Sequence, residues 1–445
     1  MRLLRIPSAA PLADGRIAGR AARRPIGRTF RALRNPNYRL YWIGQVVSMV
    51  GTWMQTIAQA WLVLRLTNSP QALGIITACQ TLPVLLFSLF SGVIADRVPK
   101  RRLLVITQTM MLVQATLVAV LTAGGWINLA MLYLLAAVLG TATALDNPTR
   151  QAFIKEMVGP EDVPNAIALN SIVMNTARLT GPALAGLTIA AVGVTACFAL
   201  NAVSFLAVIG ALLLMRPERF YEVPVPQQGR MLAQIGEGLR YARRTPEIAP
   251  IMLLAVVFGI FGYNFNIILP LLARYVLHAG PVGFGTLSSA MAVGSLIGAF
   301  RMAYSGAASQ RMLLAGAAGF SALLLCVALS TTWLMMVPAL AVLGACSITY
   351  FTTATSRVQL IVPPELRGRV MSLYAFLDLG SAPVGSLLIG ALANRLGVRP
   401  AVGAFAVACG IGTFAGFLYM RQQRARATQR APREALPPVE MKHHW

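Results

Sequence analysis

Residues 196–215 read ACFALNAVSFLAVIGALLLM and carry no charged side chain. An α-helix rises about 1.5 Å per residue, so a run of this length spans the roughly 30 Å hydrocarbon core of a bilayer. Residues 72–90 and 103–120 form apolar runs of nearly the same length. Their apolar residues surround the whole helix instead of forming one stripe. This pattern predicts membrane-crossing helices, because a surface helix of a soluble protein needs only one apolar face.

Such runs recur along all 445 residues, of which 57% are hydrophobic and 12% are charged. Soluble domains carry about 25% charged residues, so the composition indicates an all-α membrane protein. We predict twelve transmembrane helices, at residues 40–66, 71–95, 103–124, 127–147, 166–191, 195–215, 248–270, 284–304, 312–330, 332–355, 370–393 and 398–420.

The longest internal loop separates the first six predicted helices from the last six. The predicted parts are a basic N-terminal tail (1–38), a six-helix bundle (39–215), a linker (216–247), a second six-helix bundle (248–420) and a basic C-terminal tail (421–445). Within the linker, residues 230–244 place Leu232, Ile235 and Leu239 on one helical face. This segment suits a helix lying on an anionic membrane surface, or a simple tether between the bundles.

The net charge of +24 follows the predicted topology. Of the 38 Lys and Arg residues, 33 lie in the two tails and in alternate loops. Positive charge of this kind gathers on the cytoplasmic side, so we expect both termini in the cytoplasm and no nucleic-acid partner. All five Cys lie inside predicted helices, which predicts neither a disulfide framework nor a metal site.

The two halves carry related landmarks, which suggest a duplicated six-helix unit. Pro160-Glu161 precedes Pro364-Glu365 by 204 positions, and Pro182 precedes Pro383 by 201. Six-helix repeats that enclose a site near the bilayer midplane are a recurring plan of membrane transporters.

The loop after the second predicted helix combines a carboxylate with several cations. It runs from Gly92 to Arg102 and holds Asp96, Arg97, Lys100 and Arg101. Such groups can form interhelical ion pairs and helix-end contacts that differ between conformations. The spacing resembles the signature Gly-x-x-x-Asp-Arg-x-Gly-Arg-Arg of the major facilitator superfamily, with Pro99 in place of the second Gly. The resemblance implies the twelve-helix fold of that superfamily over about residues 35–420, and Gly92, Asp96, Arg97, Lys100 and Arg101 as gating residues.

The fifth predicted helix carries Gly181-Pro182-Ala-Leu-Ala185-Gly186. It is similar to the antiporter signature of the same superfamily, with Ala185 replacing one Gly. Small residues allow close helix contact, and a proline frees a backbone carbonyl. The similarity implies that Gly181, Pro182 and Gly186 take part in conformational change, and it favours export over import.

A narrower resemblance rests on the segments 146–151 (DNPTRQ), 175–178 (NTAR) and 367–372 (RGRVMS), together with Asn170. These resemble the bacterial branch that includes the enterobactin exporter and macrolide efflux pumps. That branch implies proton-driven export of a drug, siderophore or metabolite across the bacterial inner membrane. We expect a small-molecule substrate, protons and the lipid bilayer as partners of a monomer. Many such exporters carry an Arg before a Gly in the fourth helix, yet residues 136–139 before Gly140 are all aliphatic.

Few charged residues fall inside the predicted spans, and three of them are candidates for a function. A charge in mid-bilayer costs roughly 2.5–3.5 kcal/mol, so it needs a partner or a function. We predict Asp378 as the proton carrier and Arg178 as a coupling or packing switch. Asp146 is expected to cap or gate the cytoplasmic end of its helix. A structural ion pair is the alternative for each of them.

The first predicted helix carries a polar stripe at steps of three and four residues, formed by Gln45, Ser48, Thr52, Gln55 and Gln59. The stripe should face either a wet cavity or another helix. In the superfamily that the motifs resemble, the first, fourth, seventh and tenth helices line a central cavity. The resemblance therefore implies that the stripe lines the substrate cavity, opposite Tyr263, Asn264, Asn266 and Tyr350 of the second half. Trp53 and Phe265 could add aromatic contacts or face lipid. Neutral amides and aromatic rings suit an amphipathic solute.

The sequence contains no His-Glu-x-x-His, no Gly-x-Ser-x-Gly and no phosphate-binding loop. Only three His residues are present, and two of them lie at the C-terminus. We therefore expect neither an enzyme nor a bound cofactor. An importer, or a membrane sensor or scaffold without transport, remains the alternative.

Overall fold

The computed structural model describes residues 30–221, 231–305 and 308–430. Within these ranges, it does not describe the side chains of residues 88–93, 95–97, 231–235, 243–244, 379 and 424–430. All longer elements in the described ranges are helices, and no strand occurs there.

Six long helices form the first half of the structure. They are α1 (Pro36–Thr67), α2 (Pro70–Arg97), α3 (Lys100–Ala123), α4 (Leu129–Val158), α5 (Val163–Val192) and α6 (Val194–Leu214). Capping residues fix the starts of several of them. Asn35 accepts hydrogen bonds from the backbone amides of Asn37 and Tyr38, and the following Pro36 occupies the first helical turn.

The second half contains more helical pieces. After α7 (Met231–Arg244) come α8 (Ala249–Phe261), α9 (Phe265–Leu271) with the π-helical turn η4 (Leu272–Val276), α10 (Pro281–Ser305), α11 (Gln310–Leu329), α12 (Trp333–Ile361), α13 (Pro364–Gly380), α14 (Ala382–Leu396) and α15 (Val398–Arg430). Short 3-10 turns, η2 (Arg31–Arg34) and η3 (Pro217–Arg219), lie beside the first half.

The predicted all-α membrane fold is confirmed. Ten helical segments are long and apolar enough to cross a bilayer by themselves. The two long helices outside that set, α1 and α5, complete the twelve spans. Both carry polar side chains: α1 has the glutamine stripe, and α5 has Asn175 and Arg178.

Three predicted helices differ from the observed ones. The span predicted at 248–270 is broken between α8 and α9 at Gly262–Asn264, and the span at 370–393 is broken at Ser381. Pro383 explains the second break, because proline cannot continue the backbone hydrogen bonds of a preceding helix. The helix predicted to end at residue 147 runs on to Val158, and its added turns bury Phe153 and Met157.

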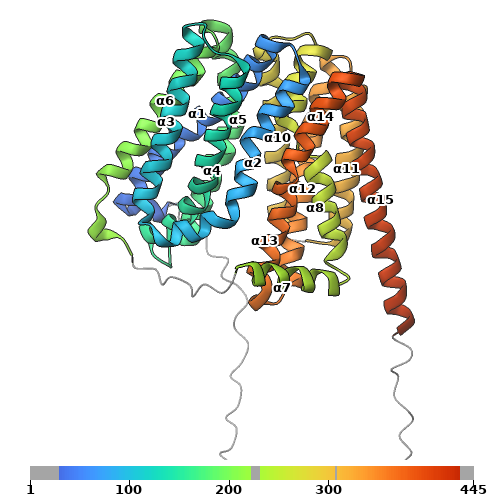
Figure 1. Cartoon of the computed structure of the whole chain (residues 1–445). Coiled ribbons are helices and arrows are strands. Elements are labelled where there is room, and N and C mark those ends of the chain that lie inside the picture. Colours follow the sequence, from blue (N-terminus) through green and yellow to red (C-terminus); the bar gives the residue numbers. More distant parts are fainter. Residues whose placement is uncertain (1–29, 222–230, 306–307, 431–445) are drawn as a thin grey trace, which may run out of the picture.

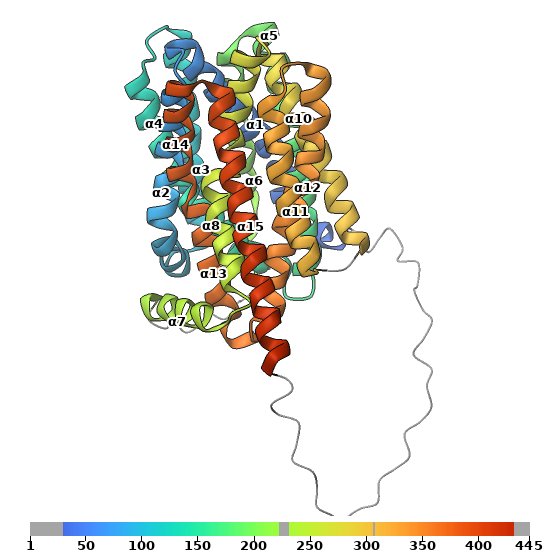
Figure 2. The same ribbon diagram turned by 90° about the vertical axis from the view of Figure 1, so that its right-hand side faces the viewer.

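The helices pack as two groups, α1–α6 and α8–α15 (Figure 1). Figure 2 shows α15 running beside α8 and α11, which it contacts. We call the end where α1 begins and α15 ends the tail face, and the other end the far face. Helix α7 lies across the tail face against α13, where Glu237 pairs with Arg369 (Figure 1). The surface role predicted for this linker helix stays a prediction.

Two seams join the groups, α2 against α14 and α5 against α10. Glycines bring the backbones together. A Cβ atom on Gly74 would lie 2.5 Å from the carbonyl oxygen of Ser386, and one on Gly186 would lie 2.8 Å from that of Pro281. No side chain fits at such distances, so the seams are backbone-to-backbone contacts toward the far face.

The predicted tails fall mainly outside the described residues. Of the N-terminal tail, residues 1–29 lie outside, whereas η2 packs beside α5 and Arg31 pairs with Glu161 and Asp162. Of the linker, residues 222–230 lie outside. The C-terminal tail was predicted to begin at residue 421, yet α15 continues as a helix to Arg430, and residues 431–445 lie outside.

Candidate functional site

One face of α5 packs against α10 over part of its length and is exposed over the rest. Pro182 and Gly186 of this face pack against α10. The same face continues toward the tail face as Ser171, Asn175 and Arg178, at helical steps of four and three residues, and all three are exposed. The two groups of helices therefore meet near the far face and separate along α5 toward the tail face.

A small pocket lies where the groups separate. It is lined from the first group by Trp53, Arg178 and Pro182, and from the second by Phe265, Asn266 and Ser288. The guanidinium carbon of Arg178 lies 5.7 Å from the centre of the Trp53 ring, in a cation–π contact. Sequence reasoning placed Arg178, Pro182 and Asn266 in transport roles separately, and the structure brings them to one pocket.

The gating motifs occupy the ends and the seams of the helices. Lys100 pairs with Glu156 of α4 at 2.6 Å. Arg101 donates to the carbonyl oxygens of Leu212 (2.7 Å) and Leu213 (2.8 Å) at the C-terminal end of α6. A cation suits this end because its carbonyls carry partial negative charge.

The remaining gating residues are partly described. Gly92, Asp96 and Arg97 belong to α2, but their side chains lie outside the described part of the structure. A Cβ atom on Gly181 would lie 2.5 Å from that of Trp53, so this position of the antiporter-like motif joins α5 to α1.

The expectation that the α1 stripe lines a cavity is wrong for most of its members. Gln45, Ser48, Gln55 and Gln59 are buried, each at most 7% exposed. Gln55 donates to Gln114 of α3 at 2.9 Å and accepts from Asn201 of α6 at 2.7 Å. The stripe therefore faces neighbouring helices of the first group. Thr52 is half-buried, and its hydroxyl donates to the carbonyl of Ser48.

The residues expected across the cavity divide in the same way. Asn266 is exposed and lines the pocket. Asn264 and Tyr350 are instead buried among the helices of the second group: Asn264 donates to the carbonyl of Ile260, and the Tyr350 ring stacks on Phe258 with 4.3 Å between centres. These two expectations are corrected. Helical periodicity identifies a face but not the neighbour that the face meets.

Tyr263 interacts electrostatically with an ionisable side chain of each group of helices. Its ring is half-buried and its hydroxyl donates to the carbonyl of Ser347 at 3.4 Å. It interacts electrostatically with both Asp378 and Arg178. This one phenol therefore interacts with a carboxyl of the second group and a guanidinium of the first.

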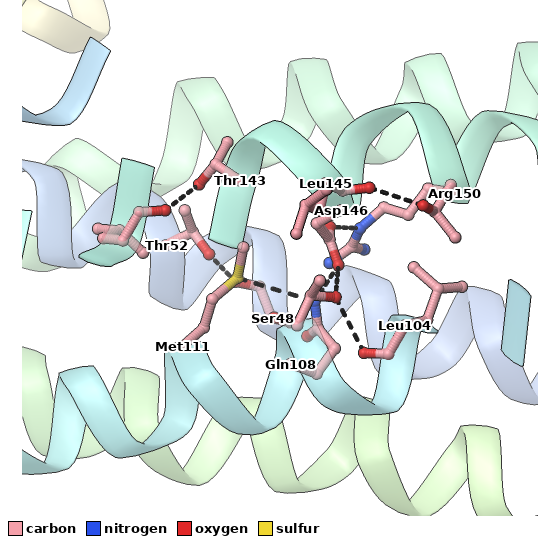
Figure 3. Close-up of polar contacts among 12 residues, drawn as sticks. Ser48, Thr52, Leu104, Gln108, Met111, Thr143, Leu145, Asp146 and Arg150 are labelled. Carbon is pink, nitrogen blue, oxygen red and sulfur yellow. Dashed lines mark hydrogen bonds and ion pairs between the residues drawn. The ribbon is translucent and has the colours of Figure 1, made fainter. Parts of the chain in front are cut away.

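Asp146 is held in a buried ion pair with Arg150, one helical turn further along α4 (Figure 3). Thr107 and Gln108 of α3 donate to its other oxygen at 2.8 and 2.7 Å. Asp146 is only 2% exposed, and the helix continues beyond it. It therefore does not cap a helix end. Sequence reasoning missed Arg150 as its partner, although the i, i+4 spacing is the signal for such a pair.

Asp378 differs from Asp146 in forming no ion pair with a described side chain. It is 8% exposed, and its Oδ1 atom has no hydrogen-bond partner among the described residues. Three tyrosines, Tyr263, Tyr350 and Tyr374, interact with it electrostatically. Sequence reasoning missed Tyr374, which lies one turn before Asp378 on α13. A carboxylate in such a place is costly without a partner, so Asp378 stays a candidate for a function.

Comparison with known proteins identifies a matching family and several similar transporters. Residues 28–444 match the family described as transmembrane secretion effector. The staphyloferrin A transporter of Staphylococcus aureus is 26% identical over 354 residues, covering 78% of this chain and 87% of that protein. Macrolide efflux protein A of Streptococcus pyogenes is 21% identical over 370 residues, covering 80% and 89%. A solved bacterial homologue of the human lysosomal transporter Spinster superposes with a TM-score of 0.68 at 16% identity, covering 87% and 97%.

Proposed function

Because the chain belongs to the transmembrane secretion effector family of the major facilitator superfamily, we propose that it exports a small amphipathic molecule by alternating access. The observation that carries this proposal is the face of α5. It is closed against α10 near the far face and exposed from Arg178 toward the tail face. One rocking motion about the pocket would exchange the open and closed ends.

The orientation of the chain gives this motion a direction. We place both termini in the cytoplasm, on the strength of the Lys and Arg distribution. The tail face is then cytoplasmic, and the described conformation is open to the inside and closed to the outside. Substrate would enter from the cytoplasm or inner leaflet, bind beside Arg178 and leave after the seams open. The relatives named for efflux support export rather than import.

Accessibility of the α5 face tests this orientation. In a cysteine-free background, Asn175→Cys is expected to react with a membrane-impermeant maleimide in inside-out vesicles, because residue 175 is exposed below the seam. The matched control is Leu206→Cys, at an exposed apolar position of α6, which should stay unlabelled in lipid. If Asn175→Cys were labelled faster in right-side-out cells than in inside-out vesicles, the proposed orientation or conformation would be contradicted.

Energy coupling is proposed to use protons, with Asp378 as the carrier. Its carboxyl forms no ion pair within the part of the chain that the structure describes, whereas Asp146 is neutralised by Arg150. A proton carrier must exist in both its protonated and its ionised form during the transport cycle. A carboxylate that is permanently paired with a cation is held in the ionised form. We therefore assign Asp146 a structural role and keep Arg178 as a charge that responds to substrate or conformation. We propose that the monomer is the working unit.

Transport itself is tested by comparing deletion with overexpression in the host cell. We expect deletion to raise the susceptibility to at least one drug, or the retention of one secreted metabolite, and overexpression to do the opposite. The purified chain in proteoliposomes should then move that compound when a proton gradient is imposed. Absence of flux for every compound that changes in cells would favour a membrane sensor or scaffold, and flux only toward the cytoplasm would favour an importer.

A further inference from the structure

Arg178 is a charge near the middle of a membrane-spanning helix, and no carboxylate among the described side chains pairs with it. It lies near the middle of the 30-residue helix α5. None of the ion pairs between described residues includes it, and its side chain donates no hydrogen bond to another described residue. Its cation–π partner, the Trp53 ring, is uncharged, and so is the Tyr263 phenol, with which it interacts electrostatically. A charge within a membrane-spanning helix that faces an opening without a partner marks a candidate substrate site.

Neither of the two buried carboxylates, Asp146 and Asp378, pairs with Arg178 among the described residues. The Asp146 carboxylate pairs with Arg150 and accepts two further hydrogen bonds from α3. Asp378 is buried in the second group beside tyrosines, and Tyr263 is the residue that interacts with both Asp378 and Arg178. The pocket therefore presents one unbalanced positive charge.

The geometry leaves the binding edge of this guanidinium available. The guanidinium carbon lies 5.7 Å from the centre of the Trp53 ring, and the Arg178 side chain is exposed, so its N–H donors can be reached from the opening between the groups. A guanidinium edge matches a carboxylate through two parallel hydrogen bonds. Around it the pocket supplies the exposed amide of Asn266 and the half-buried ring of Trp53, and the buried rings of Phe265 and Phe284 lie behind them.

We propose that Arg178 is the recognition site for a single carboxylate group on the exported molecule, whose apolar body lies beside Trp53 in the opening between the two groups of helices. This inference rests on the proposed export function and names its substrate class, an amphipathic organic monoanion. A carboxylate carries one negative charge and balances one arginine. A phosphate monoester carries about 1.5 to 2 negative charges near neutral pH, so it would leave excess charge in the pocket.

The test compares three naphthalene probes that share one body. Naphthylacetate carries a carboxylate, naphthylacetamide is its neutral amide, and naphthylethylamine is cationic. Binding to the purified full-length protein in lipid nanodiscs is measured by calorimetry. The wild type should bind the carboxylate at least about tenfold more tightly than the amide, the difference expected for one charge-assisted hydrogen-bond pair. The amine should bind most weakly.

Substitutions test which side chain causes the preference for the carboxylate probe. Arg178→Gln should make carboxylate and amide equal, and Arg178→Lys should keep part of the preference because it retains the charge without the planar edge. Trp53→Leu should weaken all three probes while the carboxylate remains preferred. The matched control Arg395→Gln, at an exposed arginine on the far face, should behave as the wild type. If Arg178→Gln does not yield monodisperse protein, the Lys variant carries the comparison.

The proposal is overturned if no carboxylate preference exists in the wild type, or if the preference survives in Arg178→Gln. If the wild type shows no preference for the carboxylate probe but export is intact, only the assignment of a monoanionic substrate is contradicted. Such a result would leave Arg178 as a partner of Asp378 in another conformation. Loss of export in cells, with the preference intact in nanodiscs, would instead contradict the export function and leave the anion site standing.

Discussion

Replacement of Asp378 by Asn is expected to leave substrate binding intact and to lower proton-driven transport by at least about tenfold, which corresponds to about 1.4 kcal/mol of barrier. Asn has the shape of the neutral acid, so it fits the buried place beside Tyr374. It cannot release or accept the proton that drives the cycle. Uptake by inside-out vesicles with an imposed proton gradient measures the drive, and equilibrium binding measures the substrate site.

Two controls accompany this variant. Asp378→Glu keeps a carboxyl and should retain part of the proton-driven rate. Glu365→Gln removes an exposed carboxylate from the same helix, α13, and should change nothing. Undiminished drive in Asp378→Asn would remove Asp378 as the proton carrier, and equal loss of binding and drive would indicate a packing role.

Replacement of Asp146 by Asn is expected to destabilise the folded protein by about 3–5 kcal/mol, the cost of leaving one partner of a buried ion pair alone. Arg150 would keep its charge among the helices of the first group without the carboxylate that now pairs with it. The hydrogen bonds from Thr107 and Gln108 could persist to the amide oxygen, so the loss reports the unpaired charge. Thermal and denaturant unfolding in nanodiscs give the change in stability.

The double variant Asp146→Leu with Arg150→Met separates the ion pair from packing. Both charges are then gone, so most of the lost stability should return, because well-packed apolar residues often replace a buried pair without cost. A single Asp146→Asn variant as stable as the wild type would show that the pair contributes little. A double variant as unstable as the single one would show that the site needs its polar network.

The sequence was sufficient to predict where the chain is helical in the membrane, because an uncharged run of about twenty residues has few other stable forms. It did not reveal the break between α8 and α9, since Tyr263 and Asn264 are followed by the apolar run of α9. It also placed the end of α4 too early. Asp-Asn-Pro resembles a helix end, yet the pair with Arg150 and the burial of Phe153 keep the helix going.

The candidate site was predictable in its residues more than in its contacts. Arg178 and Asp378 stood out because charges inside apolar runs are rare, and both lie where a function or a partner is needed. The direction of the glutamine stripe was not predictable. Gln55 satisfies its amide with Gln114 and Asn201, which lie 59 and 146 positions away in the chain, and no local pattern announces such partners.

The polar contacts at the two ends of the molecule differ in their chemistry. On the tail face, ion pairs join Lys100 to Glu156 and Arg369 to Glu237. On the far face, the described contacts between the groups use neutral acceptors: Arg274 and Tyr275 donate to Asn68, beside glycine-lined seams.

Dissolved salt screens attraction between exposed charges but scarcely affects close backbone packing. If the far face meets the surroundings of the cell, its closure would be indifferent to the salinity of that medium. The salt-sensitive contacts would lie in the cytoplasm, where the cell itself regulates ionic strength.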